Sequence, residues 1–460
     1  GYRTPRFEQL SSEIILAKTA VALHNLVASP KTFDITLFGL VHMVLFLVAL
    51  ARLFYVTQGL AMPWVIWALM ILVLTDTAYV AYWNSLYTEP ASCIWFLFLL
   101  AESFTFCTSE RITLWSVVRW NIFAVLWITA KMQNVPLCLP LAAYSLGIAW
   151  RALDRRIQWA AIAGVVAMLA AGAIMYRALR PAPRVMPVYG LVFYGILPGS
   201  PDPQSDLIAL GLNPDYARYS GTLPWSPDTG VADEALVNAV LTKVTPLRVA
   251  AFYLKRPARM WRHVKPLLPT YLSLRPESCG NFDISAGRPP GARSYAVALW
   301  SRFHDRGLAR IGPLLLASLV LAIVGGCLAL TLKRLPVVVR RWTELGTCLA
   351  ACCLTAFLVA AFGDANDNAK HQFLFNLLLD TCLAFGLVAA LQRASPRLVA
   401  HALFACRVET RLDACPPTFR GAISTSFPAA SVGPANTGKS SIDPSRQPVK
   451  WAKHTRLPQS

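Results

Sequence analysis

Nine runs of apolar residues recur along the first 391 residues, with short polar stretches between most of them. A helix needs about 20 apolar residues to cross the hydrocarbon core of a bilayer. The pattern therefore predicts an all-α polytopic integral membrane protein with about nine transmembrane helices. The predicted spans are residues 36–56, 61–80, 91–107, 113–130, 135–150, 157–177, 311–332, 343–362 and 373–391.

Polar and proline-rich residues separate the sixth run from the seventh and predict a soluble insertion outside the membrane. The residues after the last run are rich in Pro, Ser and basic side chains, which is typical of a disordered tail. The sequence thus predicts five parts. They are a juxtamembrane amphipathic helix in 1–34, a first bundle of six spans in 35–177, the insertion in 178–310, a second group of three spans in 311–392 and a basic cytoplasmic tail in 393–460.

A short amphipathic pattern precedes the first span. Apolar residues recur there at three- and four-residue steps and would share one stripe of a helix over residues 7–28. We expect this helix to lie flat in the membrane interface with the stripe facing lipid. The alternative is that the stripe packs on the insertion. The stripe consists of Phe7, Leu10, Ile14, Ala17 and Val21.

Composition narrows the class of protein further. Apolar residues make up 55% of the chain and charged residues only 15%, which excludes both disorder and a soluble single domain. The net charge of +19 would suggest a nucleic-acid partner for a soluble protein. In a membrane protein, Lys and Arg instead mark the cytoplasmic side of the bilayer. We therefore expect membrane lipids, and no nucleic acid, as partners.

The connections between spans predict the orientation. If nine spans alternate, the basic residues of the short connections and of the tail share one side, which is then cytoplasmic. In the connections these residues are Arg111, Arg151, Arg155, Arg156, Lys333, Arg334, Arg340 and Arg341. The outer side then receives residues 1–35, 81–90, 131–134, 178–310 and 363–371.

Two carboxylates flank the connection between the second and third spans. Asp76 lies about one turn inside its apolar run, where a charge is costly unless it has a partner or a function. Glu89 precedes Pro90 in the first turn of the next helix, where the helix dipole also favours a negative charge. Both are candidate catalytic residues, and Tyr79 and Asn84 are candidate ligands for a sugar or phosphate.

The connection after the fourth span carries a cation on the predicted outer side. We expect Lys131 to face an anionic phosphate near the membrane surface, with Gln133 and Asn134 hydrogen-bonded to a sugar or phosphate. The alternative is a lysine whose apolar stem lies in the membrane while its ammonium reaches water.

The last outer connection, residues 363–371, adds further polar candidates. Lys370 and His371 are expected to bind phosphate. Asp364 and Asp367 could ligate a divalent cation, or they could form a polar turn and a helix cap. A divalent cation is the one cofactor that these residues suggest. Asp380, deeper in the last span, is expected to be the buried partner of a cation.

Basic and aromatic residues alternate in the insertion between Phe252 and His263. On the outer side of a membrane this pattern favours lipid headgroups or a polyanionic glycan as partners. The alternative is a solvated amphipathic helix.

Together these features resemble the membrane glycosyltransferases of the GT-C fold, which use polyprenyl-phosphate sugars as donors. The resemblance rests on the amphipathic helix before the first span, the acidic connection 76–90, Lys131, and the connection 363–371 with the Phe-Leu-Phe-Asn sequence that follows at 373–376. Within that class, residues 194–198, 207–212 and 252–257 look like the bacterial glycan-biosynthesis hexose transferases.

This resemblance implies an enzyme of the bacterial cytoplasmic (inner) membrane with an extracytoplasmic active face. A carboxylate would take a proton from a hydroxyl of a glycan or lipid-linked acceptor while that oxygen attacks the anomeric carbon of the donor hexose. One displacement inverts the anomeric configuration. Lys131 would stabilise the departing lipid phosphate, assisted by His371 or Lys370.

One feature departs from the family pattern, in which the base follows the first span. Here no Asp occurs in the first thirty-three residues, and Glu8 and Glu13 lie on the amphipathic helix. We expect an N-terminal truncation, with a tenth span and the base before Gly1; otherwise Asp76 or Glu89 takes the role. A lipid-linked-sugar flippase and a non-catalytic partner of a glycan assembly complex are the alternatives to a transferase.

Overall fold

The computed structural model describes residues 10–27, 33–60, 62–178, 181–276, 279–282, 284–331, 335–363 and 368–394. The chain divides into two units, residues 1–396 and 397–460, and every described residue lies in the first. These residues form helices and loops, and no β-strand occurs among them. The predicted all-α polytopic membrane fold is confirmed.

A helix occupies each of the nine predicted spans. Six of the nine are long and apolar enough to cross a membrane, while α3, α6 and α7 are shorter. The helices are α2 (Ile35–Thr57), α3 (Pro63–Leu74), α5 (Glu89–Thr108), α6 (Leu114–Ile128), α7 (Cys138–Arg151), α8 (Arg155–Ala178), α16 (Gly312–Thr331), α17 (Val337–Gly363) and α19 (Phe373–Ala394).

The predicted span at 61–80 is interrupted. Helix α3 starts at Pro63, which is suited to the first turn of a helix because it needs no hydrogen-bond acceptor there. It ends at Leu74, because the Asp76 side chain accepts a hydrogen bond from the Ala78 N–H and caps a new helix, α4 (Thr77–Val80). The polar cap thus divides the apolar run into two helices.

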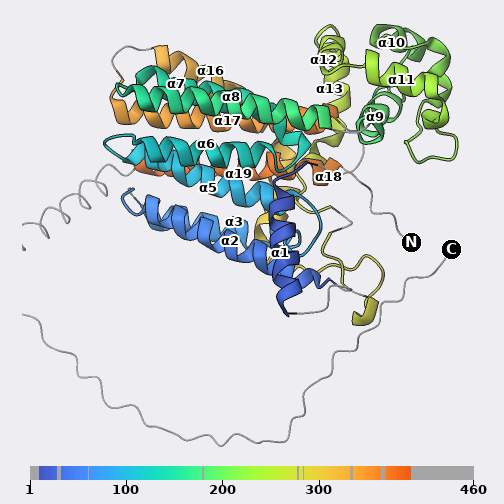
Figure 1. Cartoon of the computed structure of the whole chain (residues 1–460). Helices are drawn as coiled ribbons and strands as arrows, with labels where there is room; N and C mark the ends of the chain where they lie inside the picture. The colour runs from blue at the N-terminus through green and yellow to red at the C-terminus, as the bar shows by residue number, and fades with distance from the viewer. Residues whose placement is uncertain are drawn as a thin grey trace, which may run out of the picture. The chain divides into compact units, whose positions relative to one another are not determined.

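The spanning helices lie side by side (Figure 1), with α5 between α2 and α6, α8 against α6 and α7, and α17 against α16 and α19. Large aromatic side chains fill the space between them, among them Phe96, Trp120, Trp127 and Phe375. Helices α2 and α5 begin, and α6 ends, at the end of the bundle where the insertion joins α8 to α16. We call this the insertion end. The other end, where α5 ends and α6 begins, is the opposite end.

The insertion is a set of short helices, of which residues 185–253 form a separate hydrophobic core, whereas buried residues of 264–279 join the core of the bundle. Asp202, Asp233 and Thr245 each cap a helix by accepting a backbone N–H, which explains why so polar a sequence is helical. Its helices are α9 (Pro181–Tyr189), α10 (Pro203–Leu210), α11 (Glu234–Lys243), α12 (Pro246–Leu254), α13 (Pro257–Val264), α14 (Leu268–Tyr271) and α15 (Leu299–Arg306), with a π-helical segment, η2, at Gly190–Ile196.

Helix α1 (Glu13–Val27) packs on α2 rather than on the insertion. Of the predicted apolar stripe, Leu10 and Val21 are 46% and 43% exposed, as a stripe that faces lipid would be, and Phe7 lies outside the described residues. The buried face instead carries Glu13, Leu16, Ala20 and His24. A polar contact decides this face: Glu13 Oε1 lies 2.6 Å from Nε2 of His42, which is fully buried in α2.

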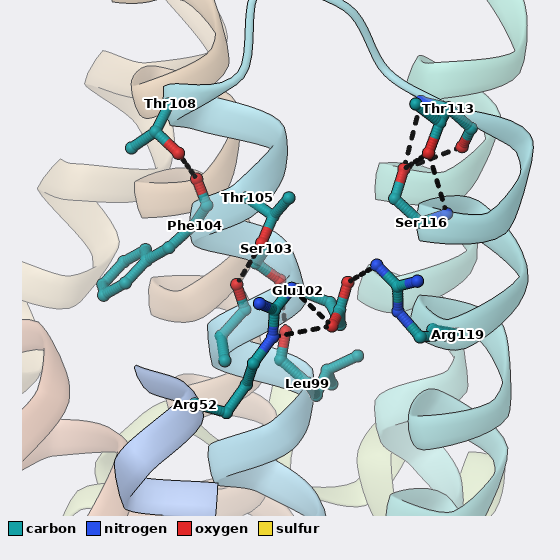
Figure 2. A network of polar contacts seen from close by, with 11 residues as sticks. Arg52, Leu99, Glu102, Ser103, Phe104, Thr105, Thr108, Thr113, Ser116 and Arg119 are labelled. Carbon is teal, nitrogen blue, oxygen red and sulfur yellow. Dashed lines mark hydrogen bonds and ion pairs between the residues drawn. The ribbon is translucent and has the colours of Figure 1, made fainter. Parts of the chain in front are cut away.

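A second buried carboxylate joins three helices nearer the opposite end (Figure 2). Glu102 of α5 is 2% exposed, and it accepts hydrogen bonds from Arg52 of α2 at 3.2 Å and from Arg119 of α6 at 3.0 Å. The arginine side chains are 31% and 45% exposed. Each guanidinium can therefore stay partly hydrated while it neutralises the same buried charge, which holds α2 and α6 against α5.

Because either arginine alone can neutralise Glu102, we predict that the stability losses caused by substituting the two arginines are not additive. Arg52→Gln or Arg119→Gln alone should cost roughly 1 kcal/mol of stability or less, whereas the double variant leaves a buried charge unpaired and should cost about 3–5 kcal/mol. Adding Glu102→Gln to the double variant should recover most of the loss. Thermal unfolding in detergent micelles measures the effects, with exposed Glu110→Gln as the control. Additive losses would contradict this account.

Candidate functional site

The candidate site at the insertion end is built on an ion pair between Glu89 and Lys131. Glu89 lies in the first turn of α5 and is 2% exposed. Lys131 follows α6 and precedes a short 3-10 helix, η1 (Met132–Leu137). The Lys131 ammonium donates to Glu89 Oε1 at 2.7 Å, and its side chain is 19% exposed. The end of α6 and the start of α5 thus place the two charges together. The buried carboxylate therefore has the counter-charge that its burial requires.

Other predicted ligands line a pocket beside this pair. Asn134 is anchored because its Nδ2 donates to Ser92 Oγ at 3.1 Å and to the Trp127 carbonyl at 2.9 Å. Its Oδ1 is buried and accepts no hydrogen bond from the described residues. Gln133 and His371 complete the polar part of the pocket wall, so three connections that are distant in sequence meet here. The cavity volume is about 10 Å³, about the space of one water molecule.

The other predicted phosphate and metal ligands are placed differently. The Lys370 ammonium lies over the ring of Tyr87, 5.1 Å from its centroid. Asn84 is exposed and lies against Gly39 of α2, away from the pocket. Asp364 and Asp367 lie outside the described residues. Within the described part of the chain, no group of three or more His, Cys, Asp or Glu side chains could hold a metal ion.

Asp76 does not line the pocket and is fully buried. Its Oδ1 accepts from the Ala78 N–H at 2.9 Å, and its Oδ2 accepts from the Ser301 N–H at 2.9 Å. The carboxylate thus joins α4 to α15 of the insertion. Because each oxygen already accepts an N–H group, taking up a proton would disrupt one of these two contacts.

Tyr79 belongs to a buried cluster around Asp380, the carboxylate of the last span. The Tyr79 hydroxyl and Trp300 Nε1 donate to Asp380 Oδ2 at 2.7 and 2.8 Å, and His304 Nε2 lies 2.7 Å from Oδ1. His304 is the buried partner expected for Asp380. His304 Nδ1 lies 3.0 Å from the Leu272 carbonyl and must donate to it. A proton therefore lies between Nε2 and Asp380, and the cluster ties α19 to the insertion.

Glu13 and His42 repeat this arrangement beside the pocket. His42 Nδ1 donates to the Trp83 carbonyl at 2.9 Å, and a proton is shared between Nε2 and Glu13 Oε1. Glu13 Oε2 also accepts from the Ala91 N–H, two residues after Glu89. Sequence reasoning placed Glu13 on the amphipathic helix and did not consider His42. The available signal was an ionisable residue, His42, within an apolar span.

A larger cavity lies in the insertion, between η2 and helices α12 and α13. Its volume is about 440 Å³, and Tyr194, Tyr253, Arg259, Arg262 and His263 are among its lining residues. The His263 imidazole lies against the Ala361 carbonyl at the end of α17, at 3.2 Å. Burial lowers the pKa of His263, which favours the neutral imidazole near neutral pH.

Comparison with known proteins identifies the family of the chain. The family described as the YfdI N-terminal transmembrane domain matches residues 2–402. This match covers most of the chain, and the chain therefore belongs to that family. No curated protein and no solved structure matches it.

The ion pair at the pocket gives a stability prediction. Lys131→Met should lower the free energy of unfolding by about 3–5 kcal/mol, because it leaves the Glu89 carboxylate buried without a counter-charge. Combining Lys131→Met with Glu89→Gln removes both charges and should recover most of that stability. The thermal unfolding midpoint of the purified protein in detergent measures both effects.

Lys255→Met provides the matched control, since Lys255 is an exposed lysine that forms no ion pair with a described residue. It should leave the unfolding midpoint unchanged. If Lys131→Met behaves like Lys255→Met, the contact between Glu89 and Lys131 does not contribute to the fold.

Proposed function

We propose that this member of the YfdI N-terminal transmembrane domain family is a glycosyltransferase of the membrane. It moves a hexose from a polyprenyl phosphate to a hydroxyl of a glycan or lipid-linked acceptor, with inversion of the anomeric configuration. One observation carries the proposal: Glu89, Lys131, Gln133, Asn134 and His371 line a single pocket at the insertion end. A buried carboxylate, a cation and amide groups are the groups that this reaction needs.

Glu89 is the proposed general base. Its Oε1 faces Lys131, while its Oε2 has no hydrogen-bond partner among the described residues and can accept the proton of an acceptor hydroxyl. Asp76 and Glu13 use both of their oxygens in contacts within the protein. Glu89 is therefore the carboxylate best suited to take up a proton as the acceptor oxygen attacks the anomeric carbon.

Lys131 is the proposed ligand of the departing lipid phosphate. A lysine ammonium has three N–H donors, of which Glu89 occupies one. The remaining donors can bind phosphate oxygens, so one cation bridges the base and the leaving group. The negative charge that develops on the phosphate then forms next to a fixed positive charge, which lowers the barrier. His371 assists in the same pocket wall.

The pocket in this structure is smaller than its proposed ligand. A volume of about 10 Å³ holds about one water molecule, not a hexose. Donor binding therefore requires side chains of the wall, such as Gln133 and His371, to move aside. Both are partly exposed, whereas Asn134 is buried and anchored.

We further propose that the insertion end faces away from the cytoplasm in the bacterial inner membrane. Arg111 lies between α5 and α6, and Arg151, Arg155, Arg156, Arg340 and Arg341 lie in the terminal turns of α7, α8 and α17, all at the opposite end. Positive residues in short connections favour the cytoplasmic side. The phosphate of an extracytoplasmic lipid-linked sugar would then lie at the level of Lys131.

The proposal predicts the product and its dependence on Glu89. Purified protein in lipid nanodiscs is incubated with radiolabelled polyprenyl-phosphate glucose, galactose or mannose and with lipid-linked glycans from bacterial envelopes. We expect a labelled glycosidic product of inverted configuration. Glu89→Gln should slow its formation by about 10²–10⁴-fold, the usual contribution of a general base, while Glu110→Gln, at the opposite end, should leave the rate unchanged.

Asp76→Asn separates the two carboxylates that sequence analysis left as alternatives. We expect it to lower the unfolding midpoint, while the rate per folded protein stays within about tenfold of the unchanged protein. In liposomes, movement of label across the bilayer without a new glycosidic bond would instead indicate a flippase. Absence of both product and movement would indicate a non-catalytic partner of a glycan assembly complex.

A further inference from the structure

The larger cavity in the insertion has the size and wall of a ligand site. Its volume of about 440 Å³ falls within the range of about 300–1,000 Å³ that is usual for small-molecule pockets. Phe252, Ile196, Pro198 and Leu267 make much of the wall apolar. None of these residues belongs to the pocket around Glu89 and Lys131.

Tyr253 lines the cavity, and its hydroxyl, which is closed off from solvent, has no partner among the described residues. The ring of Tyr253 is held by Phe252, His263 and Phe362, with ring centroids 4.7–5.8 Å apart. The residue is 4% exposed, yet its hydroxyl forms no hydrogen bond with any described residue. A buried hydroxyl without a partner costs stability, and such groups are rare in native proteins. A ligand that displaces the groups covering the hydroxyl and supplies a hydrogen-bond partner would remove this cost.

The charges at the cavity are positive. Arg259 is held by an ion pair with Asp206, which is 3% exposed, and by the Ile196 carbonyl. Arg262 lies one turn further along α13, is exposed and forms no ion pair with a described residue. His263 is predominantly neutral near neutral pH, so Arg262 is the cation that remains available to a ligand.

We infer that this cavity binds a saccharide, and that Arg262 favours one with an acidic substituent. An apolar and aromatic wall fits the C–H faces of a sugar ring, while the Tyr253 hydroxyl and the guanidinium groups fit its oxygens. Gly195, Gly199 and Gly221 lie in the wall and allow a ring to approach the backbone. A phosphate ion alone would leave the apolar wall uncovered, and a lipid tail would leave the cations and the hydroxyl without partners.

This inference does not rest on the proposed transfer reaction. A glycan can be held in the insertion whether the protein transfers a sugar to it, moves it or assembles with other proteins. The pocket around Glu89 and the cavity share no lining residue, so substitutions can be made in either one alone.

Saturation-transfer NMR on the full chain in nanodiscs tests the inference. The probes are a panel of neutral disaccharides, a panel of disaccharides that contain glucuronic acid, and inorganic phosphate. We expect saturation of disaccharide ring protons, with tighter binding of the acidic panel. Tyr253→Phe should weaken binding about three- to tenfold, the usual effect of one hydrogen bond. Arg262→Gln should weaken binding of the acidic disaccharides and leave binding of the neutral disaccharides unchanged.

Thermal unfolding separates a binding role of the Tyr253 hydroxyl from a structural one. Because that hydroxyl has no partner within the protein, Tyr253→Phe should leave the unfolding midpoint unchanged or raise it. A lowered midpoint would mean that the hydroxyl serves the fold. Tyr295→Phe and Arg306→Gln are the matched controls, since both residues are exposed and lie outside the cavity wall.

Three results would overturn the inference: no saturation of any disaccharide, binding of inorganic phosphate alone, or equal binding by Tyr253→Phe and the unchanged protein. Glu89→Gln should bind disaccharides normally. A Glu89→Gln variant that binds normally but forms no product supports both the cavity and the proposed base, whereas a failure of transfer by the unchanged protein leaves the binding result intact.

Discussion

The need to neutralise buried carboxylates governs the arrangement of this bundle. A charge in an apolar interior is costly unless it is paired or hydrogen-bonded. Glu102 holds α2 and α6 against α5 through two arginines, Glu13 holds α1 on α2 through His42, and Asp380 ties α19 to the insertion through His304. Each pair joins elements that apolar packing alone would leave free to slide or rotate. The carboxylates therefore fix which faces of the helices meet.

Glu89 differs from the other buried carboxylates in how much of its bonding capacity the protein uses. Asp76 and Glu13 each accept at both oxygens, and Glu102 binds one arginine at each oxygen. Glu89 accepts only from Lys131 among the described residues, and only at Oε1. A carboxylate that served the fold alone would gain from a second donor. The unoccupied oxygen, next to a cation with donors to spare, is the reason for proposing Glu89 as the base.

Sequence patterns predicted where the helices of the bundle lie, because length and hydropathy decide this locally, although six of the nine are long and apolar enough to cross a membrane. The same patterns predicted that Glu89, Lys131 and His371 lie at one end of the bundle, since alternation of spans places their connections on the same side. The three residues do line one pocket. The patterns failed where a distant polar contact decides the outcome. They did not predict that Glu13 lies on the buried face of α1, where its partner is His42. Asp76 could not be recognised as a cap for α15, because its second donor, Ser301, is 225 residues away.

Helix α17 connects the pocket and the cavity physically. Ala356 lines the pocket around Glu89, while Phe362 packs on the Tyr253 ring and the Ala361 carbonyl faces His263. Ala356 and Phe362 are six residues apart, which is about 9 Å along a helix. A helix is stiff over so short a length, so a shift of this end of α17 alters both walls. The pocket and the cavity thus share one helix end, although they share no lining residue.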